Sequence, residues 1–324
     1  MQTGTTNGQY FIRSEIWEAE IKEELFPALT ESFPHMKWLT GAFPDGDTLT
    51  IPTTGRVPVR SYVENNEITV DDPTNNEIQL VIDKYYQAGL GVTDKFKQDS
   101  YMAAMAIATW RQDMVRGLKE KIEADVFNTI HSDTVNGQTL NDSNNITVNG
   151  TAYKHRWAAS GTSEIFDFND FRHAKFVHDK ANVPKNERVA FVDPKVSHDL
   201  LGVTSTDAGA VYRQDVYGQN TFIQEGFGTG SLIGRFYGYW VFETNMLPTV
   251  DSETLANYAG TGKTVTSAVV NQFLGLESLF GAFRQNIEIE QFRDPFRKRD
   301  VMSACLRFGT RVYRPESVIA VLSV

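Results

Sequence analysis

The sequence predicts an α+β fold, in which extended strands and one long helix precede a mixed domain. Residues 47–92 contain short strand-like runs between turn residues, and residues 99–130 carry apolar side chains at helical spacing without a proline. Beyond residue 170, helical and strand patterns alternate along the chain. At 324 residues the chain can bury a substantial core.

Residues 14–29 form the first predicted element, a short amphipathic helix. Ser14 is its expected N-cap, and Ile16, Trp17 and Ile21 lie on its apolar stripe. A helix this short is not stable alone in water. Its stripe must therefore dock on its own domain or on another subunit.

Residues 47–92 are predicted to form a long, exposed β-hairpin. Strand-like runs occur at 48–51, 57–63, 68–70 and 78–82, separated by proline, glycine and asparagine-rich turns. Because a two-stranded ribbon is marginally stable by itself, neighbouring surfaces must support it.

Residues 99–130 are predicted to form one helix, capped by Asp99 or Ser100 and roughly 45 Å long. Its stripe consists of Ile107, Trp110, Met114, Leu118, Ile122, Val126 and Ile130. Periodicity alone fits either the spine of an elongated subunit or a long core helix of an enzyme.

The second half of the chain is predicted to alternate between helices and strands. Residues 131–167 form turns, short strands or a surface insertion, 170–179 begin a helix, 188–192 form an apolar strand, and 195–201 form a helix. An aromatic strand at 237–242 is expected to be buried, since base-stacking platforms need a basic groove. A polar loop is predicted at 250–262, and final strands at 287–292, 301–312 and 318–321.

The composition excludes several classes of protein. Thirty-one basic and 41 acidic residues give a formal charge of -10, the wrong sign for coating a phosphate backbone. Cys305 is the only cysteine, so the chain cannot form an internal disulfide. We expect no secretion signal and no membrane span, because no long apolar run occurs.

The spacing of the candidate motifs does not fit catalysis or cofactor binding. Residues 260–264 resemble the end of a phosphate-binding loop, but the glycine required five positions before Gly262 is Asn257. The glycines at 226–234 lack dinucleotide-binding spacing, and the six histidines lack zinc-ligand spacing. We therefore predict no catalytic residue, cofactor or metal. The mixed charges at 294–300 favour an intersubunit or solvated surface.

Several short motifs occur in a characteristic order along the chain. They lie at 46–52 (Gly-Asp-Thr-Leu-Thr-Ile-Pro), 71–74 (Asp-Asp-Pro-Thr), 80–84 (Leu-Val-Ile-Asp-Lys), 92–94 (Val-Thr-Asp), 188–194 (Arg-Val-Ala-Phe-Val-Asp-Pro), 238–248 and 308–316. In this order the chain resembles the major capsid proteins of tailed bacteriophages, which have the Hong Kong 97-type fold.

The resemblance implies a division of the chain into five parts. They are an N-terminal arm (1–46), an extended loop (47–92), a peripheral domain with the spine helix (93–189), an axial domain (190–285) and strands returning to the peripheral domain (286–324). Candidate intersubunit contacts are Ile16, Trp17, Ile21, Pro52, Arg56, Tyr62, Glu64, Asp294, Arg297 and Arg299, and candidate hinges are Gly89 and Gly91.

The resemblance also implies function and partners. The chain is expected to form pentamers and hexamers of an icosahedral head in the virion, enclosing double-stranded DNA without reading its sequence. Assembly would occur in the bacterial cytoplasm with a scaffolding protein and a portal protein, and a decoration protein is a further candidate partner. The alternatives are an encapsulin-like shell around cargo enzymes and, from another class, a nucleotide-dependent enzyme using Lys263.

Overall fold

The computed structural model describes residues 36–39, 46–54, 57, 59–65, 67, 70, 75–100, 103–132, 134–135, 138–139, 146–148, 151–202, 232–256 and 262–324. The helix predicted at 14–29 lies outside these residues, as do the candidate contacts Ile16, Trp17, Ile21 and Arg56. Both helices and sheets are present, and the predicted α+β fold is confirmed.

One sheet is long and narrow. Its strands, in spatial order, are β1 (Met36–Trp38), β15 (Leu279–Asp294), β16 (Arg299–Val312) and β4 (Lys84–Thr93). β15 and β16 pair antiparallel from Leu279↔Val312 to Asp294↔Arg299, and β4 pairs antiparallel with β16. At about 3.3 Å per residue, the 16 residues of β15 extend roughly 50 Å.

The long helix α3 (Ala103–Ser132) packs on one face of this sheet. Its C-terminal half is buried, and Ile122, Val126 and Ile130 belong to the same core cluster as Leu306 and Phe308 of β16. The helix predicted at 99–130 begins later, at Ala103. A separate helix, α2 (Asp94–Asp99), precedes α3.

Local chemistry explains this break in the helix. Thr93 caps α2, because its Oγ1 accepts a hydrogen bond from the Phe96 N–H at 3.3 Å, and Asp99, a predicted cap of the long helix, is the last residue of α2. Ser100 then has extended backbone angles of φ −97° and ψ 117°. Since α2 has no buried residue, little packing energy is available to hold it in line with α3.

The second sheet has seven strands and forms a compact body. They are β11 (Leu232–Phe236), β12 (Tyr239–Glu243), β10 (Arg188–Val192), β14 (Gly262–Leu274), β17 (Val318–Ser323) and β9 (Arg156–Ala158), with β13 (Thr249–Ala256) paired to β14. β10 pairs parallel with β12 and antiparallel with β14. Strand β10 was predicted with these bounds, and α5 (Pro194–Gly202) follows it as expected.

Strand β10 is buried on both faces. Ala190 and Val192 share a core cluster with α4 (Phe168–Lys180), whereas Val189 and Phe191 share one with the end of α3. A strand covered on both faces reads as an uninterrupted apolar run, which is the pattern that predicted it.

Helix α4 begins with a reciprocal cap. The Asp167 carboxylate accepts a hydrogen bond from the Phe168 N–H at 2.6 Å, and the Asp170 carboxylate accepts one from the Asp167 N–H at 3.0 Å. Each bond pairs an N–H that the helix itself leaves unsatisfied. The helix predicted at 170–179 is therefore confirmed, and its first turn starts slightly earlier.

A β-hairpin projects from the base of the long sheet. It consists of β2 (Thr48–Thr54) and β3 (Asn75–Val81), paired antiparallel from Thr48↔Val81 to Thr54↔Asn75. The predicted strand at 57–63 is wrong for the residues that the structure describes there, 57 and 59–63, because none of them is in a strand. A ribbon without a covering layer gains too little from pairing to extend further.

Short elements complete the described chain. They are β5 (Thr134–Val135), β6 (Gln138–Thr139), β7 (Ile146–Val148), β8 (Thr151–Tyr153) and the 3-10 helices η2 (Thr162–Glu164) and η4 (Pro315–Ser317). The first four strands form two small hairpins within 131–167, in agreement with the prediction of short strands.

Two predictions for the seven-stranded body are wrong. In the polar segment predicted as a loop at 250–262, the described residues 250–256 and 262 are in strands, because β13 pairs with β14 from Thr249↔Val269 to Ala256↔Gly262. Its alternating polar side chains are those of a half-exposed strand. In the aromatic run, Tyr237 and Gly238 form a turn with positive φ, and the buried strand starts at Tyr239.

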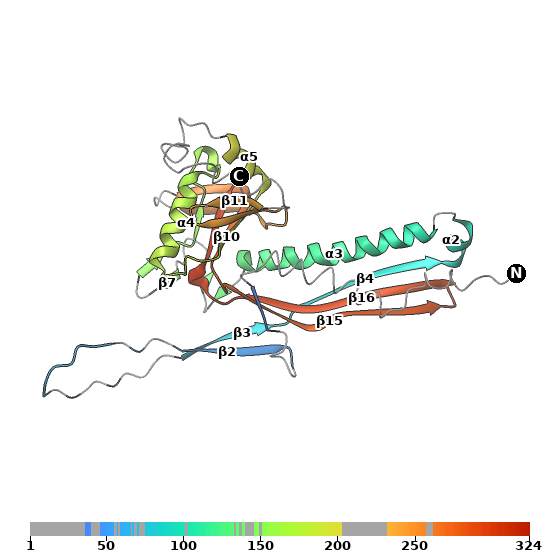
Figure 1. Ribbon diagram of the computed structural model, residues 1–324, viewed down its shortest axis with the longest axis horizontal. Helices are drawn as coiled ribbons and strands as arrows, with labels where there is room; N and C mark the ends of the chain where they lie inside the picture. The colour runs from blue at the N-terminus through green and yellow to red at the C-terminus, as the bar shows by residue number, and fades with distance from the viewer. Residues whose placement is uncertain are drawn as a thin grey trace.

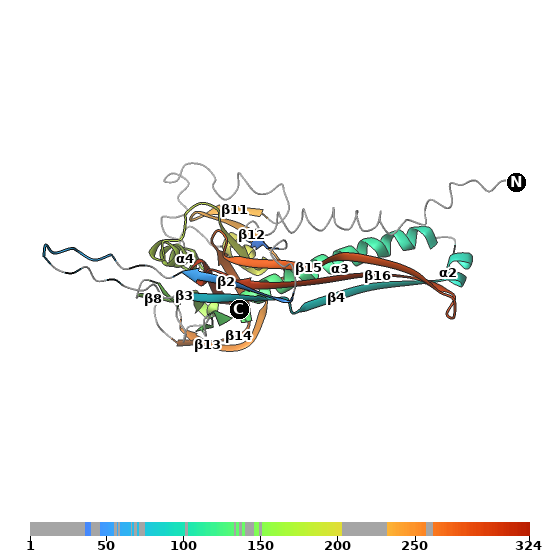
Figure 2. The same cartoon turned by 90° about the horizontal axis from the view of Figure 1, so that it is seen from below.

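The whole molecule is elongated, as Figures 1 and 2 show. The seven-stranded body lies toward one end, α3 and the long sheet reach to the tip formed by α2, and the β2–β3 hairpin points the opposite way. The two bodies do not follow the contiguous segments predicted at 93–189, 190–285 and 286–324. Helix α4 and strand β17 both belong to the seven-stranded body, because the chain crosses between the bodies repeatedly.

Candidate interaction surfaces

The end of the β2–β3 hairpin carries an unusual amount of apolar surface. Its exposed large side chains, which we call the loop patch, are Val57, Val59, Tyr62, Val63 and Val70. Val59 is 98% exposed and Tyr62 is 68% exposed. Grouped apolar side chains on a soluble protein commonly mark an interaction site.

The other candidate contacts on the hairpin are also accessible. Pro52 is exposed on β2, where it pairs with Glu77, and a proline there cannot donate to a further strand. Glu64 is exposed and precedes Asn65, which has a φ of 66°. Tyr62, Glu64 and Pro52 thus lie on the projecting element.

The turn between β15 and β16 lies at the opposite end of the molecule. The Asp294 carboxylate accepts hydrogen bonds at 3.2 Å from the N–H groups of Phe296 and Arg297, and at 3.4 Å from Arg299 Nε. Partial burial opposes these donors, but together with the charge of Arg299 they lower the pKa of Asp294 below its ordinary value. The structure thus brings together Asp294, Arg297 and Arg299, which the sequence had placed in one surface.

An ion-pair network fixes this turn to α2. Arg293 donates to both carboxylate oxygens of Asp94, at 3.0 and 2.5 Å, and to Asp300 at 2.9 Å, and Lys97 also bonds Asp300. The Arg293 bond lowers the pKa of Asp94, and the Lys97 bond lowers that of Asp300. No sequence pattern points to Asp94, Lys97 and Arg293, because Asp94 and Arg293 are 199 residues apart.

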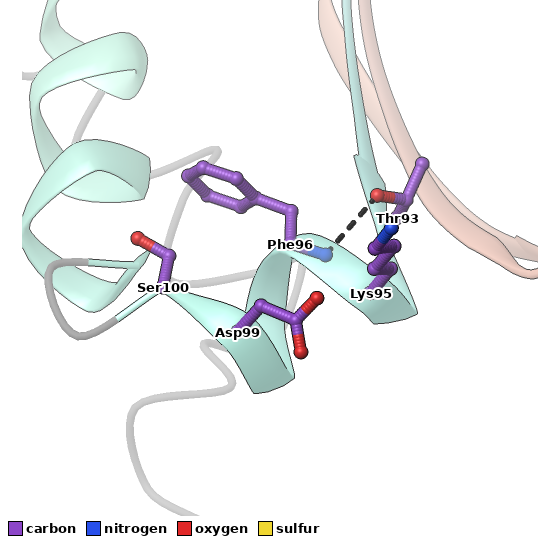
Figure 3. Close-up of a pocket in the computed structure, with 5 residues that line it drawn as sticks. All are labelled: Thr93, Lys95, Phe96, Asp99 and Ser100. Carbon is purple, nitrogen blue, oxygen red and sulfur yellow. Dashed lines mark hydrogen bonds between the residues drawn. The ribbon is translucent and has the colours of Figure 1, made fainter.

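A shallow hollow lies beside this network at the tip. It is lined by Thr93, Lys95, Phe96, Asp99 and Ser100, and the Phe96 ring points toward α3 (Figure 3). The Phe96 ring centroid lies 5.4 Å from that of Trp110 on α3. Aromatic and charged groups therefore meet around one opening.

The two predicted hinge glycines lie inside a regular strand. Gly89 pairs with Ser303 and Gly91 with Val301, on the face of β4 turned away from α3. Neither has a positive φ. Their role as hinges stays a prediction. Because glycine has no side chain, the sheet face at these two positions is exposed backbone.

Lys263 is not part of a phosphate-binding loop. It lies in β14, where its ammonium group is 3.2 Å from a Glu164 carboxylate oxygen and 3.4 Å from the Gly161 carbonyl oxygen. A phosphate-binding loop needs a strand, a glycine-rich turn and then a helix. The lysine instead connects β14 to the start of η2.

Metal-binding clusters and membrane-spanning helices are absent from the described part of the chain. There, no three or more His, Cys, Asp or Glu side chains are grouped so that they could hold a metal. Among the same residues, no helix has the length and apolar character needed to cross a membrane. Histidines are used in packing: His178 is fully buried and bonded to Tyr239, and His173 meets the Trp157 ring edge-on at 4.8 Å.

The fold defines a structural protein of the Hong Kong 97 type, with exposed apolar side chains at both ends of the molecule. Residues 75–321 match the family model described as phage capsid protein. The chain belongs to this family and is a structural component of the virion capsid, not an enzyme.

Solved capsid structures share the fold at low sequence identity. The chain is 17% identical to a structure from Mycobacterium phage Che8, with a TM-score of 0.58 over 86% of this chain and 85% of that one. The capsid of cyanophage P-SCSP1u is 13% identical, with a TM-score of 0.60 over 89% and 86%. The capsid of the native GTA particle is 12% identical, with a TM-score of 0.59 over 92% and 90%. The comparison with curated proteins gave no match.

Proposed function

We propose that this major capsid protein assembles into pentamers and hexamers that close into an icosahedral head around double-stranded DNA. The observation that carries the proposal is the loop patch, which places apolar side chains on a hairpin projecting away from both bodies. Exposure of these apolar groups to water is unfavourable, and contact with a neighbouring copy removes them from water. A weak contact repeated around each subunit then gives a stable wall.

The proposed parts follow the arrangement of the two sheets. Residues 1–46 are the arm, and 47–92 contain the loop that overlaps a neighbour. The long sheet with α2 and α3 forms the peripheral domain. The seven-stranded body forms the axial domain, which meets its mates around each ring. Gly89 and Gly91, in β4, are the proposed hinges between ring types.

The partners follow from this mode of assembly. A scaffolding protein would guide curvature, a portal protein would replace one ring, and a decoration protein could bind the finished surface. The formal charge of -10 supports a wall that contains DNA without adhering to it. Assembly would take place in the bacterial cytoplasm.

Substitution in the loop patch tests the proposal. We expect Val59→Asp with Tyr62→Asp to leave the subunit folded, because both side chains are largely exposed, and to abolish closed shells. Electron microscopy would count shells and circular dichroism would report folding. Phe176→Asp on α4 is the control, since this exposed side chain lies outside the loop. Normal shells from the double variant would refute the role of the loop patch.

The contents of the particles test the second part of the proposal. Particles purified from infected cells should hold nuclease-protected double-stranded DNA. Particles filled with one enzyme instead would identify a cargo-holding shell.

A further inference from the structure

The tip of the molecule carries a projecting aromatic side chain that no residue of the described part of the chain covers. Phe296, in the β15–β16 turn, is 97% exposed. The turn is rigid, because Asp294 accepts from two of its backbone N–H groups and the Lys298 carbonyl accepts from the Asp94 N–H at 3.0 Å. A fixed apolar projection is suited to binding, since little conformational entropy remains to be lost.

The hollow beside α2 has the shape and chemistry to receive such a side chain. The hollow is shallow and open to solvent, with a volume of about 490 Å³. Phe96 offers an aromatic wall supported by Trp110, and Asp99 adds an exposed carboxylate. Arg297, next to Phe296, is 71% exposed and lies 4.0 Å from Asp294, so its charge can also reach an outside partner.

We infer that Phe296 of one copy enters the α2 hollow of a second copy, and that Arg297 of the first copy pairs with Asp99 of the second. This inference rests on the proposed function and adds a specific contact to it. Phe296 and the α2 hollow occupy different places on one tip, so the contact is head-to-tail. Each tip can insert its own Phe296 into one neighbour and receive the Phe296 of another. Such contacts close into a ring where the tips of adjacent pentamers and hexamers converge.

The ion-pair network has a defined part in this contact. Arg293, Asp94, Asp300 and Lys97 hold the turn against α2, so projection and hollow keep a constant spacing within each subunit. A constant spacing lets identical copies repeat the same contact around a ring.

A charge exchange tests the pairing. Arg297→Glu and Asp99→Lys should each raise the subunit concentration needed for shell formation by about tenfold, since opposite charges become like charges. The combined variant should recover most of the loss, because the pair is restored with its signs reversed. Light scattering and electron microscopy would measure assembly. A combined variant no better than the single ones would overturn the pairing.

Crosslinking tests the position of Phe296. In a Cys305→Ser background, Phe296→Cys and Asp99→Cys would be combined in one chain and the shells treated with a short bis-maleimide reagent. We expect covalent multimers on a denaturing gel, and chains with only one of the two new thiols should stay largely monomeric. Only monomers from intact shells of the double-thiol chain would overturn the inference. Wild-type chains that form no shells would instead overturn the proposed function itself.

Discussion

Single polar residues inside the seven-stranded body have defined partners, and substitution of one such residue is expected to lower the stability of the body. Arg188 is 2% exposed, pairs with Asp179 at 2.9 Å and donates to the carbonyl oxygens of Val183 and Pro184 at 2.7 and 3.0 Å. Arg156 is equally buried and makes a two-point contact with Glu253 at 3.1 and 2.6 Å. Removing Asp179 or Glu253 would leave a buried guanidinium group without its carboxylate partner.

The buried bond between Tyr239 and His178 gives one prediction. The two side chains are 2.7 Å apart, and both are shielded from water. Tyr239→Phe should lower the free energy of unfolding by about 1–3 kcal/mol, because His178 loses its partner. Urea denaturation of unassembled subunits would measure the change. Tyr62→Phe is the matched control and should have no effect, since the Tyr62 side chain is largely exposed.

His173 should make the subunit sensitive to acid. Burial, then the charges of Arg172 and Lys154, lower the pKa of His173 to about 4 from 6.5. The folded state therefore binds this proton more weakly than the unfolded state. Its stabilising contribution is complete above pH 6.5 and is lost as the pH falls through about 4.

The prediction for His173 can be separated from the titration of Asp170. Burial raises the pKa of Asp170 to about 6 against its hydrogen bonds, so its contribution is lost as the pH rises through 6. We expect His173→Phe to retain the ring contact with Trp157 and to show a smaller loss of stability than wild type between pH 6.5 and 4. Equal losses in denaturation curves would contradict this assignment.

At the scale of elements, the base of the hairpin is fixed by a close backbone approach. A Cβ on Gly309 of β16 would lie 2.2 Å from the Val81 carbonyl oxygen and 2.9 Å from Ile82 Cα. Leu80 and Ile82 also pack on Ala282 of β15 in a small core. The hairpin therefore leaves the long sheet in one direction, determined by the absence of a side chain at Gly309.

Alanine at two glycines should have opposite effects. Gly309→Ala should lower the free energy of unfolding by about 2 kcal/mol or more, because rigid backbone atoms occupy the space. Gly117→Ala, on the exposed side of α3 with nothing within 4 Å, should raise it by about 0.5–1 kcal/mol. Thermal denaturation of both variants would show the contrast. A neutral Gly309→Ala would mean that the backbone there can shift.

On the scale of the whole molecule, α3 connects the two bodies through one end only. Near its C-terminus, the Phe127 ring packs against Phe191 with centroids 5.0 Å apart, and the Phe127 carbonyl accepts from Gln272 Nε2 at 2.8 Å. Near its N-terminus, Trp110 is 38% exposed and contacts Phe96. One end of the helix thus lies in the core, and the other is partly exposed among the described residues.

Truncation at the two ends of α3 should separate folding from assembly. Phe127→Ala should destabilise the subunit by about 3–5 kcal/mol, because it leaves a cavity between the two bodies. Trp110→Ala should cost clearly less, since the side chain is already partly hydrated. Its main effect should appear in shell formation, through the wall of the α2 hollow. Equal losses of stability would contradict this division of the helix.

The local elements and their order could be predicted from the amino-acid sequence alone. Apolar periodicity gave α3 its C-terminal end within two residues, and an unbroken apolar run gave β10 its bounds. The order of short motifs led to the phage capsid family. Such elements can be predicted from the sequence because burial of one or both faces requires apolar side chains at regular positions.

Which distant residues meet became visible in the folded molecule alone. The polar strand β13 exists because β14 pairs with it, and the tip network joins residues almost 200 positions apart. The composition of the two bodies also depends on distant pairing, since β17, the last strand in the chain, pairs with β9 in the seven-stranded sheet. Long-range pairing depends on the register and packing of whole elements, and a single sequence records neither.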